Sequence, residues 1–144
     1  MIILDTNVVS ELMRPQSSAA VVEWVDMQPS DDIWLTAITL AELLYGVGRL
    51  ANGHRQRTLA EQLEAMIEED FDHRVLAFDE TAAAHYSDIV VARERLGRPI
   101  GSADAQIAAI CRSHNAVLAT RNVDDFTNAG VMIINPWTDP TGNQ

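Results

Sequence analysis

Short apolar runs alternate with segments of helical periodicity along this chain, and this alternation constrains the fold more than any other feature. The apolar runs are expected strands, and they cover residues 1–4, 33–38, 75–78, 117–120 and 131–134. Among the segments between them, the clearest helix carries Leu59, Leu63, Met66 and Ile67 at spacings of three and four. Strands separated by helices form parallel sheets with helical crossovers. The sequence therefore predicts an α/β fold with a central parallel sheet of about five strands flanked by helices.

The length of 144 residues is that of one domain. We expect the domain to span residues 1–138 and to be followed by a short C-terminal tail, 139–144. The single Cys111 cannot form an internal disulfide, which favours a reducing compartment. The sequence shows neither a signal peptide nor an apolar run near the ~20 residues that cross a bilayer. We expect a cytoplasmic protein without a membrane partner.

Residues 18–27 are apolar on almost every side of the expected helix, through Val21, Val22, Trp24 and Val25 among others. One core face cannot use all of these side chains. Either a second layer of the same chain or a partner subunit must cover them. We expect this segment to be buried between two copies of the chain.

Acidic residues recur where such a fold would gather them. Asp5 directly follows the first apolar run, Glu42 and Asp104 lie near the start of helical patterns, and residues 120–125 follow another strand. Ligand sites of open parallel sheets lie beyond the carboxyl ends of the strands. Carboxylates held close repel one another unless a cation lies among them, and their hard oxygen atoms suit Mg²⁺ or Mn²⁺. The pattern therefore indicates phosphodiester chemistry at a divalent metal.

Each acid also has an ordinary structural interpretation. Asp5 can cap the helix that follows it. Thr39 and Glu42 match the spacing of a capping box. Asp104 comes two residues after Ser102, an expected helix cap, and acids are favoured in a first helical turn. The metal hypothesis therefore depends on convergence of the three acids in space.

Several other classes of protein are disfavoured by the composition. A net charge of −11 argues against a broad basic surface for nucleic acid, so any such contact must be local. The chain contains no Lys, which phospho-acceptor domains and aspartyl-phosphate phosphatases use on the phosphoryl group. The four His residues are not paired as zinc ligands are, and Ser102 lacks the glycines of a nucleophile elbow.

The ten basic residues are all Arg, and three of them cluster at Arg93, Arg95 and Arg98. We interpret this cluster as a solvated helix face. Contact with phosphate is the alternative.

The four acidic or polar segments together resemble the PIN-domain nucleases, over essentially the whole chain. The segments are Leu4-Asp5-Thr6-Asn7, Ala41-Glu42-Leu43, Ser102-Ala103-Asp104 and Ala119-Thr120-Arg121-Asn122. Within that family the chain is similar to the VapC-type toxins of bacterial toxin–antitoxin pairs, in particular the FitB-like branch. The motifs that carry this second resemblance are Glu11 with Arg14-Pro15, Phe78-Asp79-Glu80 and Asn135-Pro136-Trp137.

The resemblance implies a three-layer α/β/α fold and a Mg²⁺-dependent (or Mn²⁺-dependent) endoribonuclease toxin acting on single-stranded or looped RNA such as tRNA. It also implies a homodimer and a cognate VapB-type antitoxin, whose tail wraps around the toxin. The toxin would contact operator DNA only through this antitoxin. Metal binding falls on Asp5 and Asp104, and metal or water positioning on Glu42. Supporting roles fall on Asn7 and Thr120.

The family often has a fourth acid two residues after the Thr, where this chain has Asn122. Asn122 can position a water but brings no charge, and Asp125, favoured over Asp124, is expected to reach into the site instead. We therefore expect one tightly bound ion. The competing hypothesis is a catalytically weak interaction subunit that acts with an antitoxin in autoregulation at DNA.

Overall fold

A five-stranded, fully parallel sheet forms the centre of the computed structural model, which describes residues 1–138. The strands lie in the order β3-β2-β1-β4-β5. Their bounds are β1 Ile2–Leu4, β2 Ile33–Thr36, β3 Val75–Leu76, β4 Val117–Ala119 and β5 Met132–Ile134. The predicted parallel sheet is confirmed. The predicted tail, 139–144, lies outside the described residues.

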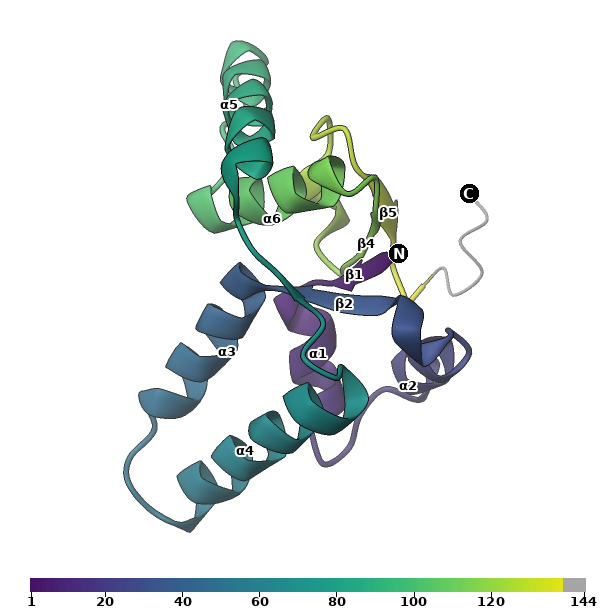
Figure 1. Ribbon diagram of the computed structural model, residues 1–144, viewed down its shortest axis with the longest axis vertical. Coiled ribbons are helices and arrows are strands. Elements are labelled where there is room, and N and C mark those ends of the chain that lie inside the picture. The colour runs from purple at the N-terminus through teal and green to yellow at the C-terminus, as the bar shows by residue number, and fades with distance from the viewer. Residues whose placement is uncertain (139–144) are drawn as a thin grey trace.

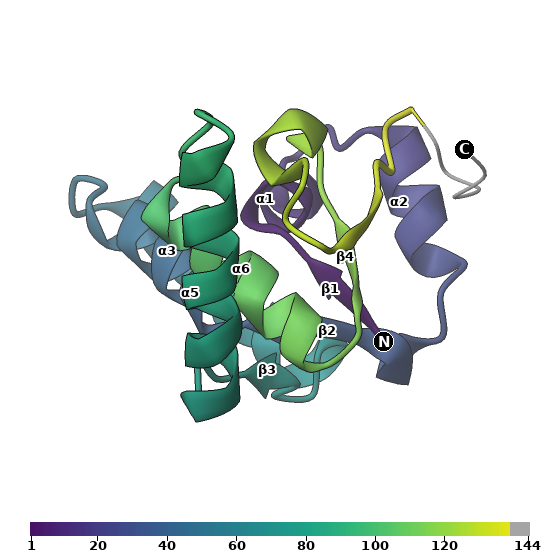
Figure 2. The same ribbon diagram turned by 90° about the horizontal axis from the view of Figure 1, so that it is seen from above.

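Six α-helices connect and cover the strands (Figure 1). They are α1 Thr6–Met13, α2 Ala19–Asp26, α3 Ala37–Gly48, α4 His54–Ala65, α5 Glu80–Arg95 and α6 Ser102–Ser113. Shorter turns of helix span Ser30–Asp32, Met66–Asp70 and Val123–Phe126. Helices α1 to α4 lie on one side of the sheet, whereas α5 and α6 lie on the other, with α5 crossing α6 (Figures 1 and 2).

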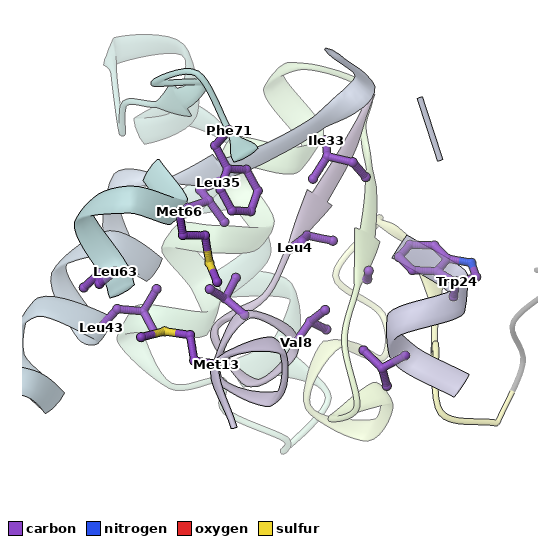
Figure 3. Packing of buried hydrophobic residues seen from close by; sticks show 13 residues of the cluster. Leu4, Val8, Met13, Trp24, Ile33, Leu35, Leu43, Leu63, Met66 and Phe71 are labelled. Carbon is purple, nitrogen blue, oxygen red and sulfur yellow. The ribbon is translucent and has the colours of Figure 1, made fainter. Parts of the chain in front are cut away.

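The sheet divides the apolar core into two clusters, because successive side chains of a strand point to opposite faces. On β1, Leu4 packs with α1 to α4, whereas Ile3 packs with α5 and α6. On β4, Ala119 and Leu118 divide in the same way. Figure 3 shows the first cluster, in which Leu4 and Val8 lie between the strands and the surrounding helices. The three-layer α/β/α fold is therefore confirmed.

The strand order fixes where a site can form. β1 is central, with β2 on one side and β4 on the other, so the connections that leave their carboxyl ends diverge there. Such a switch point is where open α/β sheets bind ligands. The backbone N–H of Asp5 donates to the carbonyl of Ala119 (2.9 Å), which holds the ends of β1 and β4 together.

Two expected helix starts are wrong by a few residues. The second strand ends at Thr36 and not at Ile38, because the Thr36 hydroxyl accepts a hydrogen bond from the Thr39 N–H and caps α3 there. The expected capping box of Thr39 and Glu42 therefore does not form. Helix α6 has Gly101 at its N-cap position, so Ser102 is its first residue and not its cap.

The segment 18–27 is largely covered within the single chain. Val21 and Trp24 of α2 are buried in the same cluster as Leu4, and Val25 packs against that cluster. Met27 remains exposed, at 77%. Since the chain itself provides the second layer, burial of this segment does not require another copy.

No helix within residues 1–138 is both long enough and apolar enough to span a membrane.

Candidate active site

Asp5 is the innermost carboxylate at the carboxyl end of β1. It occupies the N-cap position of α1, where its Oδ1 accepts from the Thr6 N–H (2.8 Å). Its Oδ2 accepts from the Thr120 hydroxyl (2.8 Å) and from the Asn7 side-chain amide (3.2 Å). Only 4% of Asp5 is exposed. Capping and site formation are therefore not alternatives, because one oxygen caps the helix while the other joins the polar network.

Thr120 and Asn7 tie the ends of β1 and β4 together. The Thr120 hydroxyl, besides donating to Asp5, accepts from the Asn7 amide (3.2 Å) and from the Asn122 N–H (3.0 Å). The Asn7 Oδ1 accepts from the Arg121 N–H (3.1 Å). Both side-chain polar atoms of Asn7 thus have partners, and these contacts fix the chain that follows β4 over Asp5. Asn7 and Thr120, the two residues expected to support the acids, both form hydrogen bonds with Asp5.

Glu42 comes from α3 and reaches the same place through a contact that the sequence does not suggest. The Thr6 hydroxyl donates to Glu42 Oε1 (2.8 Å) and lies 3.2 Å from the Thr39 hydroxyl. Thr6 is therefore a site residue that sequence reasoning missed. Its place directly after Asp5 was a signal, but its partner is 36 positions away along the chain.

Asp104 completes the set from the first turn of α6. Asp5, Glu42 and Asp104 all line one cleft of about 470 Å³, to which α1, α3, α6 and the segment after β4 contribute. The remaining lining residues are Thr6, Asn7, Ser10, Glu11, Arg14, Arg121, Asn122 and Trp137. Three acids that are far apart in the sequence therefore converge on one concave surface.

Asp104 and Asp5, two of the acids that line this cleft, are destabilised in their charged form. Burial, followed by the negative charges of Asp5, Asp125 and Glu42, raises the pKa of Asp104 to about 6. Burial also raises the pKa of Asp5, although the Thr120 hydrogen bond opposes this shift, and the charge of Glu42 adds to it. The positive charge of Arg93 lowers the pKa of Asp104 and so opposes these effects. The site is a concentration of negative charge that a cation would relieve.

The two candidates for a fourth acidic position differ in placement. Asn122 lines the cleft beside the three acids. Asp125 lies on the helical turn after it and lines an adjoining depression together with Asp124. Asp125 is near enough for its charge to raise the pKa of Asp104, whereas Asp124 is not among the charges that do so. This electrostatic difference favours Asp125 over Asp124 as the acid associated with the site.

The donor set fits a hard divalent cation in chemistry. Within residues 1–138, no three carboxylate, imidazole or thiol groups already stand at metal-ligand spacing. Mg²⁺ does not need a complete protein cage, since it usually binds one or two carboxylates and keeps several waters. Asp5 and Asp104, with Glu42 facing the same cleft, provide such a set. The raised pKa values of Asp5 and Asp104 indicate that negative charge is already costly there.

A sequence profile described as the PIN domain matches residues 2–131 of the chain. The chain therefore belongs to the PIN domain family. It is 45% identical to Toxin FitB of Neisseria gonorrhoeae, over 96% of this chain and 100% of that protein. It is 40% identical to VapC ribonuclease Y4jK of Sinorhizobium fredii, over 95% of this chain and 98% of that protein.

Solved structures agree with this assignment. The structure of FitAB bound to an IR36 DNA fragment contains a chain that matches this one with a TM-score of 0.89 and 43% identity, covering 95% of this chain and 96% of that one. The resemblance to PIN-domain nucleases of the FitB-like branch is thus confirmed.

The raised pKa of Asp104 predicts how the metal-free protein responds to pH. An acid whose pKa is higher in the folded state than its ordinary value of 3.8 binds its proton more tightly when folded. Its contribution to stability is therefore full at acidic pH and is lost as pH rises through about 6. We expect wild type to lose more stability than Asp104→Asn between pH 4 and pH 7, measured by urea unfolding in EDTA. Parallel curves for the two proteins would contradict this assignment.

Proposed function

We propose that this protein is a metal-dependent endoribonuclease that acts as the toxin of a toxin–antitoxin pair. The observation that carries the proposal is the convergence of Asp5, Glu42 and Asp104 on one cleft at the switch point of a parallel sheet. The similarity to proteins named Toxin FitB and VapC ribonuclease supports it. We place the reaction in the cytoplasm, where cellular RNA is available.

Asp5 and Asp104 would hold Mg²⁺ or Mn²⁺. When bound, such an ion polarises the scissile phosphate and lowers the pKa of a water. Glu42 would orient a water or take its proton as the water oxygen attacks phosphorus; the bond to the leaving oxygen would break, and that oxygen would take a proton from solvent water. The Thr6 hydroxyl holds Glu42 through its Oε1 atom, so that the Oε2 atom of Glu42 can accept the proton.

The proposed substrate is single-stranded or looped RNA, including tRNA loops. A strand that is not paired can be splayed into a concave acidic site, whereas a duplex cannot. The test is incubation of purified, antitoxin-free protein with total RNA and Mg²⁺ or Mn²⁺. We expect cleavage that stops when EDTA is added and resumes with excess metal. Absence of cleavage on any RNA would contradict the proposal.

Asn122 favours one other function. This position contributes no charge, so the protein carries one acid fewer near the cleft than relatives with a carboxylate there. A catalytically weak subunit that pairs with an antitoxin and adjusts operator binding remains the second candidate. It predicts antitoxin binding without RNA cleavage, which the same assay distinguishes.

A second surface suits the proposed antitoxin. An apolar groove of about 650 Å³ runs between α3 and α4 and includes Leu40, Leu44, Val47, Leu63 and Ile67. Leu44 is 56% exposed, although it is apolar. Exposed apolar surface of this kind marks a place where a partner binds. We propose that the VapB-type antitoxin packs here and that contact with operator DNA comes only through it.

A charged residue in this groove should impair antitoxin binding without impairing RNA cleavage. We expect Leu44→Asp to weaken antitoxin binding by at least about 100-fold, because a buried charge without a partner costs several kcal/mol. RNA cleavage by the free protein should be unchanged, because Leu44 does not line the acidic cleft. Calorimetric titration of the antitoxin measures the first effect. Undiminished binding by Leu44→Asp would place the antitoxin elsewhere.

A further inference from the structure

The negative charge of the acidic cleft repels RNA, and a divalent metal alone does not remove this repulsion. RNA is a polyanion, whereas the protein has a net charge of −11 and its cleft contains Asp5, Glu42 and Asp104. Affinity for nucleic acid comes largely from cationic groups on the phosphates. Any RNA-binding cation must therefore be close to the cleft itself.

Two Arg residues line the cleft, and they differ in availability. Arg14 pairs with Glu11, with 3.3 Å between Nη1 and Oε1. Arg121 forms no ion pair with any carboxylate in residues 1–138. Its guanidinium can therefore bind a phosphate without breaking an ion pair to any of those carboxylates.

Arg121 is held at the cleft from two directions. Its backbone N–H donates to the Asn7 Oδ1, so its main chain is fixed to the network around Asp5. Its guanidinium carbon lies 5.0 Å from the ring centroid of Trp137, a cation–π arrangement. Trp137 is in turn half-buried against the cluster that contains Leu4, and its backbone N–H donates to the Asn135 side-chain oxygen (3.0 Å).

We propose that Arg121 binds a phosphate of the RNA next to the scissile bond and that Trp137 is the positioning residue that orients its guanidinium. This inference rests on the proposed ribonuclease function. A planar guanidinium suits the oxygens of a phosphate, and stacking on an indole ring removes part of its conformational freedom before RNA arrives. The acids and Arg121 then have different roles, since the acids bind the metal and Arg121 binds the RNA strand.

The first experiment is kinetic, with a short fluorescent oligoribonucleotide that the wild type cleaves. We expect Arg121→Ala to raise KM about tenfold with a much smaller change in kcat. It should also lower the slope of log KM against log salt concentration by about 0.7, which is the value for one phosphate contact to a single strand. Arg121→Lys should restore the salt slope but only part of the affinity. The matched control is Arg95→Ala, an exposed Arg on α5, which should match wild type.

The second experiment tests whether Trp137 acts through Arg121. We expect Trp137→Leu to raise KM about threefold in the wild-type background, as loss of an exposed cation–π contact implies. The same change should add nothing in an Arg121→Ala background. A purely structural Trp137 would give the same loss in both backgrounds. Trp137→Phe keeps an aromatic ring and should recover most of the affinity, which guards against a folding defect in the Leu variant.

The outcomes separate this inference from the function on which it rests. If wild type cleaves no RNA, the proposed function fails. If wild type cleaves but Arg121→Ala has an unchanged KM and salt slope, Arg121 is not a phosphate contact and the inference is overturned. Loss of antitoxin binding alone in Arg121→Ala would overturn it equally. Mn²⁺ affinity, measured by calorimetry, should not weaken in Arg121→Ala, because this side chain is not part of the metal-binding acids.

Discussion

Asp104→Asn is expected to reduce RNA cleavage by about 10³-fold, since charge stabilisation by a bound metal supplies several kcal/mol and this variant removes a carboxylate that would hold it. Asparagine has nearly the same shape as aspartate, so the helix start at α6 is preserved. The effect should appear in kcat and in Mn²⁺ affinity, both of which can be measured with the purified protein.

The stability of the same variant provides an internal check. Because burial and neighbouring charges raise the pKa of Asp104, its charge opposes folding near neutral pH. Asp104→Asn should therefore be at least as stable as wild type in EDTA, so that lost activity cannot be attributed to unfolding. Sites that serve function at a cost in stability behave in this way.

Asp124→Asn is the matched control for that experiment. Asp124 is exposed, does not line the cleft and is not among the charges that shift Asp104. The same chemical change there should leave cleavage within about twofold of wild type, as surface substitutions away from a site do. Equal activities of Asp104→Asn and Asp124→Asn would show that the acidic cleft is not the catalytic site.

The sheet was predictable because its signal is local. Short apolar runs separated by helical periodicity already contain the strand positions, and the right-handed rule for parallel crossovers limits how they connect. Asp5 was predictable for the same reason, since it follows β1 directly and therefore lies at a strand end. The ends of the elements were harder to predict. Strand β2 ends at Thr36, whose hydroxyl accepts a hydrogen bond from the Thr39 N–H and so caps α3. The local sequence pattern does not show whether Thr36 or Thr39 is the capping residue.

The contacts that complete the site are not local, and this is why the sequence did not show them. Thr6 was named only as part of the first motif segment and was given no role, yet its hydroxyl donates a hydrogen bond to Glu42. Thr120 and Asp5 are 115 positions apart and share a hydrogen bond. Periodicity indicates which face of an element is apolar, but it carries no information about which polar side chain meets which. The order of the motifs suggested that the three acids converge, but the hydrogen bonds among the site residues are seen only in the folded structure.

Arg93 is the residue for which the sequence interpretation fails most clearly. The cluster of Arg93, Arg95 and Arg98 was interpreted as a solvated face of the helix, but Arg93 is only 5% exposed. Arg95 and Arg98 remain exposed. A charged residue among charged neighbours is usually solvated, and burial here depends on acceptors from another part of the chain. Arg93 is therefore a structural residue, and its interpretation as part of a solvated face was wrong.

Three backbone carbonyls surround the Arg93 guanidinium. Its Nε donates to Arg98 (2.7 Å), and its Nη1 donates to Asp125 (2.9 Å) and Thr127 (3.0 Å). One side chain of α5 thereby joins the loop that leads to Asp104 with the helical turn that carries Asp125. Helix α6, which carries Asp104, packs against the turn that carries Asp125, so Arg93 helps to set the relative position of the two acids.

Arg93→Met is expected to lower the free energy of unfolding by about 3 kcal/mol, because three part-buried hydrogen bonds from the buried guanidinium to backbone carbonyls are lost while Met retains most of the aliphatic volume. For a chain of this length that corresponds to a fall in Tm of roughly 10 °C. Urea unfolding measures the first quantity, and amide exchange should show faster opening of residues 122–129. Arg95→Met, the same change at an exposed site of α5, should lie within about 0.5 kcal/mol of wild type. If the two variants unfold alike, the carbonyl contacts of Arg93 do not hold the turn that carries Asp125, and some other contact must fix that acid beside Asp104.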